Sequence, residues 1–390
     1  MNTVRVSGKG ADRLASGHVW VFASDVTDAG GAGPGEAVIV ADPRGRHLGV
    51  AHYSSSSEIR LRLLARRVEP VGREFFHQRL AAAGRFRERH VSGSEAYRLV
   101  HGEGDLLPGL VVDKYGPYLV LQTLDQGMDR AQAEIVSVLE ELFAPAGILA
   151  RNDNAVRKHE SLPLTSDVVS GVVPEEITVS MNGLSWRLDP RRGQKTGIFL
   201  DQRENYLAAA SFAPRGEAVR MLDCFTCSGG FALHLARHAE TVEAVDSSEA
   251  SLALARRNAE ANGISNVEFR QADALDLLNA YAAARRRFSL IVLDPPAFAK
   301  SRKAVVGALR GYKEINLRAL KLLEPGGVLV TCSCSHHVSE ADLLETIASA
   351  SLDAGRTLRV LARRTQSLDH PILLTVPETL YLKCLIFEVL

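Results

Sequence analysis

The fold is decided by the stretch Val219-Arg220-Met221-Leu222-Asp223-Cys224-Phe225-Thr226-Cys227-Ser228-Gly229-Gly230-Phe231, which begins as a short apolar strand and ends in two glycines. Paired glycines at a strand-to-helix turn let the backbone approach a ligand closely. The loop is not G-x-G-x-x-G, so it does not indicate a dinucleotide pyrophosphate site. It predicts the first strand and ligand-binding turn of an α/β domain, although Gly-Gly pairs are also common in ordinary turns.

From this stretch onward, strand and helix patterns alternate. Apolar runs typical of strands cover 219–224, 241–246, 266–270, 288–294 and 327–333, and helical patterns cover 230–238, 248–262 and 307–323. This alternation predicts an open parallel sheet with helices on both faces. Sheets of this kind bind ligands at the carboxyl ends of their strands, so the residues just after each strand are the candidate site.

Acidic residues follow the next three strands at that edge. Asp246 comes about twenty residues after the glycines, where it can hold ribose hydroxyls, cap the following helix, or do both. Asp273 follows the third strand and can accept a hydrogen bond from an adenine amino group. Asp294 leads into Pro295-Pro296, a stiff extended pair that can press on a planar base. With the glycine loop, this ordered set predicts an S-adenosylmethionine-dependent methyltransferase.

The fifth strand and its loop carry two thiols, Cys332 and Cys334. A thiolate that adds to carbon 6 of cytosine makes carbon 5 nucleophilic enough to accept a methyl group, so Cys334 is a candidate nucleophile. Burial as small apolar side chains is the ordinary alternative for free cysteines. Zinc bound by these thiols with Cys224 and Cys227 is less favoured, because one pair is C-x-C inside a strand. We therefore expect no metal.

The preceding chain predicts two smaller domains. Short strand patterns separated by Gly- and Pro-rich turns predict a β-barrel or sandwich over residues 1–66. Residues 67–180 combine a helical connector with a small α+β domain, and an Asn182-Gly183 turn opens the catalytic domain, residues 181–390. The barrel strands are expected at 19–22, 37–40, 47–51 and 59–63, and the middle domain elements at 110–113, 118–121, 131–142, 147–150 and 177–180.

Charge and composition limit the partners. Lys plus Arg and Asp plus Glu number 46 each in 390 residues, so net charge does not indicate a nucleic-acid partner. Nine arginines between Arg60 and His90 form either a solvated face or a phosphate-contacting surface, and both interpretations stay open. No apolar run is long enough for a membrane span. All five cysteines follow residue 223, which is not the pattern of a disulfide framework and fits a reducing compartment, so we expect a cytoplasmic protein.

The whole chain resembles the ribosomal RNA large-subunit methyltransferase I family, which makes 5-methylcytosine in bacterial 23S rRNA. The resemblance lies in Gly17–Phe22 with Asp42–Arg46, in Gln194–Arg203, and in the strand-end motifs Asp223-x-Phe225-x-x-x-Gly229-Gly230, Asp246, Asp273, Asp294-Pro295-Pro296 and Ser333-Cys334-Ser335. It implies a PUA barrel, a small α+β middle domain and a Rossmann-like catalytic domain.

The resemblance also implies roles for individual residues. Cys334 matches the family's nucleophile and Asp294 the residue that orients the cytosine, whereas Cys332 is given no role. Ala297 stands where better-known RNA cytosine-5 methyltransferases carry a second Cys that aids product release. The implied cofactor contacts are Gln194, Lys195, Thr196, Phe199, Asp223, Phe225, Gly229, Gly230, Asp246, Asp273, Ala274, Asp294 and Pro295. The implied substrate contacts are Pro295, Pro296, Phe298, Lys300, Arg60 and Arg62.

The expected partner is 23S rRNA or the large ribosomal subunit, with no membrane partner, and a homodimer is a further hypothesis. The first alternative is a related rRNA guanine methyltransferase, which would lack the Cys of the fifth-strand triplet. A second alternative is a non-catalytic RNA-binding module with a methyltransferase fold. A small-molecule methyltransferase would leave the barrel and the Arg-rich connector without a function. Cys334 favours the cytosine reaction.

Overall fold

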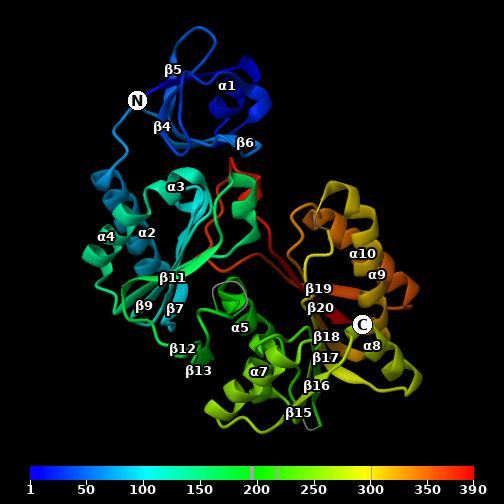
Figure 1. Cartoon of the computed structure of the whole chain (residues 1–390). Coiled ribbons are helices and arrows are strands. Elements are labelled where there is room, and N and C mark those ends of the chain that lie inside the picture. Colours follow the sequence, from blue (N-terminus) through cyan, green and yellow to red (C-terminus); the bar gives the residue numbers. More distant parts are fainter. Residues whose placement is uncertain (194–196, 217, 300) are drawn as a thin grey trace. The chain divides into compact units, whose positions relative to one another are not determined.

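The computed structural model describes residues 1–193, 197–216, 218–299 and 301–390. The chain divides into two compact units, drawn in Figure 1. Unit 1 comprises Met1–Ser180, Leu188–Gly197 and Leu368–Thr379, and unit 2 comprises Met181–Arg187, Ile198–Ser367 and Leu380–Leu390. Within the described ranges, no helix is both long enough and apolar enough to cross a membrane.

The N-terminal part of unit 1 is a six-stranded sheet with strand order β2-β6-β5-β4-β1-β3. Its core is formed by alternate residues of these strands, such as Val38 and Val40 in β4, together with Leu14 of the helix. The four expected strands are present, and the first strand, the helix and β3 were not predicted. The elements are β1 (Thr3–Val6), α1 (Gly8–Ala15), β2 (Trp20–Phe22), β3 (Val26–Asp28), β4 (Ala37–Ala41), β5 (His47–Tyr53) and β6 (Ile59–Ala65).

The middle part of unit 1 is a five-stranded sheet with order β11-β10-β9-β8-β7. The expected hairpin is confirmed, because β8 and β9 pair antiparallel with Tyr115 opposite Tyr118. Helices α2 and α4 pack on this sheet through Phe76, Leu80 and Leu139. The elements are α2 (Arg73–His90), β7 (Ala96–His101), β8 (Leu110–Tyr115), β9 (Tyr118–Thr123), α3 (Gln126–Arg130), α4 (Gln132–Phe143), β10 (Gly147–Asn152) and β11 (Thr165–Gly171).

A buried ion network joins the two parts of unit 1. The Arg62 guanidinium lies 2.8 Å from the Glu160 carboxylate and 3.7 Å from that of Asp125. Ser54 donates to Glu160 at 2.7 Å. Burial raises the pKa of Asp125 to about 6 and lowers that of the adjacent His52 to about 4. The Arg62 side chain is only 10% exposed and balances buried carboxylates, and its expected contact with RNA stays a prediction.

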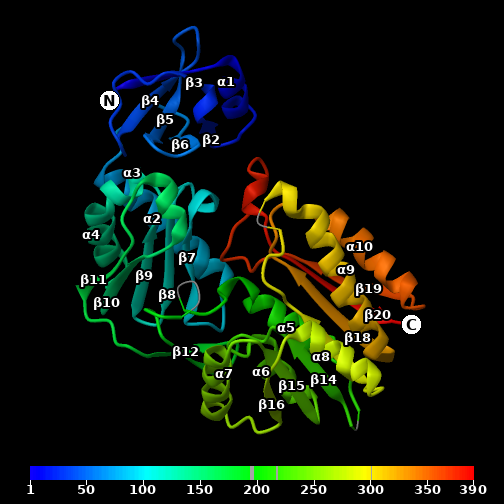
Figure 2. The same cartoon turned by 45° about the vertical axis from the view of Figure 1, so that its right-hand side comes forward.

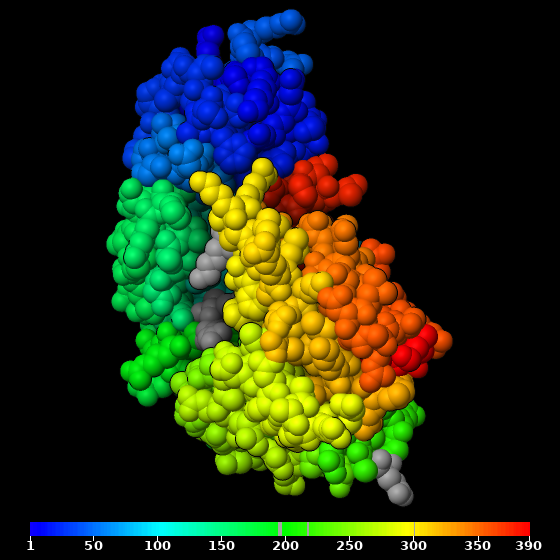
Figure 3. All heavy atoms as spheres, turned by 90° about the vertical axis from the view of Figure 1, so that its right-hand side faces the viewer, coloured from blue at the N-terminus to red at the C-terminus, as the bar shows by residue number. Residues whose placement is uncertain are grey.

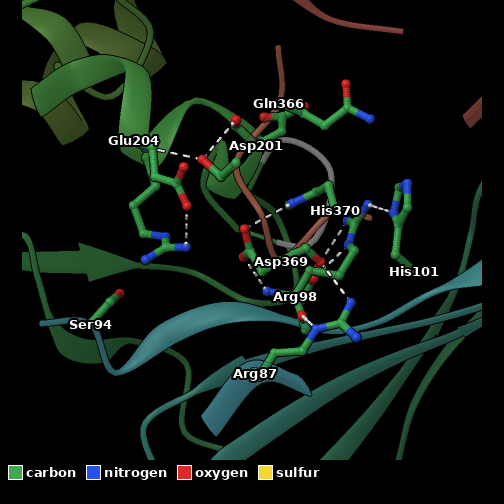
Figure 4. A network of polar contacts seen from close by, with 12 residues as sticks. Arg87, Ser94, Arg98, His101, Asp201, Glu204, Gln366, Asp369 and His370 are labelled. Carbon is green, nitrogen blue, oxygen red and sulfur yellow. Dashed lines mark hydrogen bonds and ion pairs between the residues drawn. The ribbon is translucent and has the colours of Figure 1, made fainter. Parts of the chain in front are cut away.

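The Arg-rich connector also contains a structural arginine. Arg87 is buried and makes a bidentate pair with Asp105. It donates to the carbonyl oxygens of Arg98 at 2.8 Å and Asp369 at 2.7 Å, while the Arg98 N–H donates to the Asp369 carboxylate at 2.8 Å (Figure 4). The connector is therefore not a uniform solvated face, because part of its charge holds segment 368–379 in unit 1. Arg67, Arg85 and Arg89 are exposed.

The hairpin around Asn182-Gly183 is present as β12 (Ile177–Met181) and β13 (Leu184–Leu188). Both turn residues have positive φ values, 56° and 73°, as the tight turn requires. Unit 2 then forms a seven-stranded sheet of order β16-β15-β14-β17-β18-β20-β19. Its elements are α5 (Arg203–Ser211), β14 (Arg220–Cys224), α6 (Gly230–Leu235), β15 (Thr241–Asp246), α7 (Glu249–Ala261), β16 (Val267–Gln271), α8 (Ala274–Ala283), β17 (Phe288–Leu293), α9 (Val305–Leu322), β18 (Leu323–Ser333), α10 (Glu340–Asp353), β19 (Leu358–Arg364) and β20 (Lys383–Val389).

Helices cover both faces of this sheet, as predicted. Helices α8, α9 and α10 lie side by side on one face, around Ile291, Leu329 and Leu320 (Figures 1 and 3). Helices α5, α6 and α7 lie on the opposite face (Figures 1 and 2). One strand departs from the all-parallel expectation: β20 runs antiparallel to β18 and β19. Antiparallel neighbours need no crossover helix, so the helix–strand alternation that marks parallel strands is missing there.

Candidate active site

The sheet register brings the candidate residues to one edge. Cys224 lies opposite both Val245 and Leu293, and Leu293 lies opposite Thr331. Strands β14, β15, β17 and β18 therefore end at nearly the same level. Asp246 is the last residue of β15, and the loops after β14, β17 and β18 carry the glycine pair, Asp294 and Cys334. The structure therefore gathers these residues at the carboxyl edge of the sheet, where such folds bind ligands.

The glycine loop is tightly wound. Phe225, Cys227 and Gly229 all have positive φ values, 67°, 50° and 91°. A Cβ added to Gly230 would lie 2.4 Å from the Tyr206 ring, so this position must be glycine. The second glycine therefore permits a close helix–helix contact between α6 and α5, while the strained non-glycine residues mark a turn of the kind found at ligand sites.

Asp223 supports the loop from inside the sheet. One carboxylate oxygen accepts from the Thr226 hydroxyl at 2.6 Å and from the Ala232 N–H at 3.0 Å. Burial raises the pKa of Asp223 to about 7. Among the described residues its other oxygen, Oδ1, has no hydrogen-bond partner although it is buried. A buried acceptor of this kind fits a cationic donor, such as the amino group of a methionine moiety.

Asp246 and Asp273 differ in what they do locally. Asp246 accepts from the Cys227 N–H and the Ser248 N–H, both at 2.9 Å, and the cap of α7 is Ser248 itself. Asp246 thus fastens the glycine loop to the end of β15, and its half-buried carboxylate retains lone pairs for ribose hydroxyls. Asp273 is exposed and caps α8 through the Leu275 and Asp276 N–H groups; Ala274, the first residue of α8, is buried.

The loop after β17 holds Asp294 in one orientation. Gln202 donates to the Asp294 carboxylate at 3.0 Å, and Asn205 donates to Gln202 at 2.7 Å. Pro295 is buried, Pro296 is exposed and Phe298 is half-buried against the Tyr312 ring, with centroids 4.7 Å apart. The exposed proline is therefore the one of the pair that can meet a base.

The Ser-Cys-Ser triplet is held by two residues that the sequence did not single out. The Ser333 hydroxyl donates to Tyr312 Oη at 2.8 Å, and the Ser335 hydroxyl lies 3.0 Å from the same oxygen. Lys383 donates from Nζ to the Ser335 carbonyl at 2.7 Å. A single charged residue at the start of an apolar run, Lys383-Cys384-Leu385-Ile386-Phe387, was the available signal for Lys383.

The five cysteines fall into two groups. Cys224, Cys332 and Cys384 are buried in the sheet, and burial raises the pKa of Cys224 and of Cys332 well above the usual range. Cys227 and Cys334 are half-buried at the strand ends. Burial and the Asp246 carboxylate raise the pKa of Cys227 to about 11, which makes it a poor nucleophile. In the described part of the chain, no cluster of three or more His, Cys, Asp or Glu could hold a metal ion.

The remaining expected residues have varied positions. Gln194, Lys195, Thr196 and Lys300 lie outside the described residues. Phe199 is half-buried, and its carbonyl accepts from the Tyr206 hydroxyl at 3.3 Å. Arg60, in unit 1, donates to the Ser54 carbonyl at 2.7 Å and remains partly exposed.

Comparison with known proteins agrees with this geometry. A PUA-like domain family matches residues 4–66, and a methyltransferase domain family matches residues 216–371. Ribosomal RNA large subunit methyltransferase I of Salmonella arizonae is 38% identical over 97% of this chain and 95% of its own length. The protein of the same name from Tolumonas auensis is 40% identical over 95% and 94%. The chain belongs to the ribosomal RNA large-subunit methyltransferase I family.

Solved structures agree on the fold. A SAM-dependent methyltransferase from Streptococcus mutans covers 100% of both chains with a TM-score of 0.84 at 20% identity. A second methyltransferase structure, complexed with S-adenosylhomocysteine, has a TM-score of 0.85 at 20% identity. The expected fold class, a PUA barrel, a small α+β domain and a Rossmann-like methyltransferase domain, is therefore confirmed. The expected cofactor, S-adenosylmethionine, is confirmed by the family.

Proposed function

We propose that this protein methylates carbon 5 of a cytosine in 23S rRNA, with Cys334 as the nucleophile. The observation that carries the proposal is that Asp294 and Cys334 come directly after the adjacent parallel strands β17 and β18. A thiol and a carboxyl group on neighbouring strand ends can address opposite parts of one pyrimidine ring. The relatives' name, which specifies large-subunit rRNA, supports the choice of substrate.

Three of the expected cofactor contacts have groups that support binding of the cofactor. Asp223 Oδ1 offers a buried acceptor for the amino group, Asp246 offers a carboxylate for ribose hydroxyls, and the glycine loop lies between them in the chain. Asp273 already accepts two backbone hydrogen bonds, so its share in binding the adenine would use its remaining lone pairs. When bound, S-adenosylmethionine supplies the methyl group that becomes attached to carbon 5.

The protein's part of the reaction begins with the Cys334 thiolate. Its sulfur forms a bond to carbon 6, and the displaced electron pair moves toward the ring nitrogen, where Asp294 hydrogen-bonds to the Watson–Crick edge. Carbon 5 then carries enamine electron density and would form a bond to the methyl carbon as the methyl–sulfonium bond breaks, with S-adenosylhomocysteine as the leaving group. Removal of the carbon 5 proton by a base returns electrons to the ring, and the carbon–sulfur bond breaks to regenerate the thiolate.

The test uses total large-subunit rRNA from cells lacking the protein, with purified protein and methyl-labelled S-adenosylmethionine. Wild type and Cys334→Ala are compared, and the labelled nucleosides are identified by mass spectrometry. The proposal predicts label in 5-methylcytidine that disappears in the variant. Label in a methylguanosine, or full activity in Cys334→Ala, would refute it and favour the related guanine enzyme. Failure of wild type to label any rRNA would favour a binding module.

A further inference from the structure

A buried lysine lies next to the Ser333-Cys334-Ser335 triplet. Lys383 is the first residue of β20 and lies opposite Ser333 in the antiparallel pair with β18. Its residue exposure is only 4%. Its ammonium donates to the carbonyl oxygens of Ser335 at 2.7 Å and Tyr381 at 3.0 Å. The charge therefore lies directly beside the backbone of the triplet that carries Cys334.

A buried ammonium is unfavourable unless nearby charge or hydrogen bonds compensate for lost hydration. Burial lowers the pKa of Lys383 to about 8, and attraction to Cys334 and to Glu340 of α10 opposes that shift. The Glu340 carboxylate also pairs with Arg363, so it does not belong to Lys383 alone. Cys334 lies near this ammonium, and the proposed mechanism requires the thiolate form of its side chain.

We propose that the Lys383 ammonium stabilises the thiolate form of Cys334 and so prepares it for attack on the pyrimidine. The inference rests on the proposed nucleophilic role of Cys334. Lys383 acts as a positioning and electrostatic residue, since its contacts are with protein carbonyls. A second titratable group that faces Cys334 is Tyr312 of α9, which hydrogen-bonds to Ser333 and Ser335 and stays neutral, because burial raises its pKa.

The contrast with Cys227 supports this assignment. Both thiols are half-buried at the carboxyl edge of the same sheet. Cys227 faces the Asp246 carboxylate, which opposes ionisation, whereas Cys334 interacts with the Lys383 cation. Opposite neighbouring charges should give these two similarly placed thiols opposite reactivities. Cys227 is therefore an internal reference for the chemistry of Cys334 within one molecule.

The experiment measures alkylation by iodoacetamide from about pH 5.5 to 10, a range that spans the ordinary thiol pKa, without RNA or cofactor. Site-resolved mass spectrometry follows the Cys334 and Cys227 peptides. In wild type, Cys334 should reach half-maximal reactivity below the ordinary thiol value of about 8.5. In Lys383→Met, whose side chain is similar in length but uncharged, the midpoint should rise by about one unit, which lowers the rate at about pH 7 roughly tenfold. Cys227 should react equally in both proteins.

A midpoint that is unchanged in a folded Lys383→Met would overturn the inference. If that variant does not fold, as judged by its thermal melt, the wild-type profile decides: a Cys334 midpoint at or above the ordinary value contradicts the proposal. Because no methyl transfer is measured, failure here is separate from failure of the cytosine assignment. Loss of rRNA labelling in Cys334→Ala alongside an unchanged alkylation profile in Lys383→Met would remove only the role of Lys383.

Discussion

Replacing Tyr312 with Phe tests how the nucleophile loop is held. The Tyr312 hydroxyl makes hydrogen bonds with Ser333 at 2.8 Å and Ser335 at 3.0 Å, and its ring packs on Phe298. Tyr312→Phe keeps the ring and removes both hydrogen bonds. At about 0.5–1.5 kcal/mol net for each bond, the free energy of unfolding should fall by about 1–3 kcal/mol.

The larger effect is expected on the reaction. The two serines flank Cys334, so without their hydrogen bonds to Tyr312 the thiol can shift away from the position from which it reaches the base. Misplacement of a reacting group by about 1 Å can lower a rate about a hundredfold, so kcat should fall between tenfold and a hundredfold with little change in KM. Urea unfolding gives the stability, and steady-state methylation of rRNA gives kcat and KM.

The matched control is Tyr281→Phe, in the same unit. Tyr281 is buried and donates its hydroxyl to Glu243, away from the strand-end loops. This variant should lose a similar amount of stability and keep kcat close to the wild-type value. A Tyr312→Phe enzyme that is destabilised as expected but retains kcat within about twofold would show that the hydroxyl only stabilises the fold and does not position Cys334.

Three further predictions concern other parts of the chain. Burial holds the pKa of Asp223 at about 7, so below that pH its carboxyl group is protonated and cannot pair with the cofactor's amino group. The S-adenosylmethionine affinity, measured by calorimetry, should therefore fall up to about tenfold per pH unit below that value, whereas the affinity of Asp223→Asn should hardly depend on pH. The same pH dependence in both proteins would contradict this. Arg62→Met should lower the free energy of unfolding by about 3–5 kcal/mol, because it leaves buried carboxylates unpaired. The control Arg60→Met should lower it by less than about 1 kcal/mol in the same urea titration. Similar losses in the two variants would show that the buried ion network does not stabilise the protein. Changing the exposed Arg85 and Arg89 to Gln should weaken rRNA binding. The slope of log affinity against log salt concentration should become shallower by about 0.7–0.9 for each phosphate that is no longer neutralised. An unchanged slope would show that these two arginines only contact solvent.

Much of the catalytic unit could be predicted because its signals are local. Strands β14, β15, β17 and β18 are apolar runs that each carry a candidate residue at or just after their carboxyl end, so Asp223, Asp246, Asp294 and Cys334 could be placed by spacing alone. Parallel topology then requires those strand ends to meet at one edge, which the register confirms. Strands β19 and β20 and helices α5, α8 and α10 were not predicted, and β20 runs antiparallel, so no helix–strand pattern precedes it.

The missed residues depend on interactions between distant parts of the chain. Tyr312 looks like an ordinary apolar-face residue of a helix, and only the fold shows its hydroxyl between Ser333 and Ser335. Arg62 alternates with apolar residues as an exposed strand residue would, yet its side chain is buried against the carboxylates of Glu160 and Asp125. A partner so far away along the chain leaves no mark in a local pattern.

The proposed function depends on a covalent bond between Cys334 and carbon 6 of a cytosine in 23S rRNA. The most direct measurement incubates the protein with S-adenosylmethionine and large-subunit rRNA in which cytidine is replaced by 5-fluorocytidine. Fluorine at carbon 5 cannot leave as a proton does, so the carbon–sulfur bond should persist. We predict a nuclease-trimmed nucleotide attached to Cys334 in the peptide mass spectrum, and none in Cys334→Ala. Methylation-competent protein that yields no adduct, or an adduct on Cys227 instead, would contradict the account.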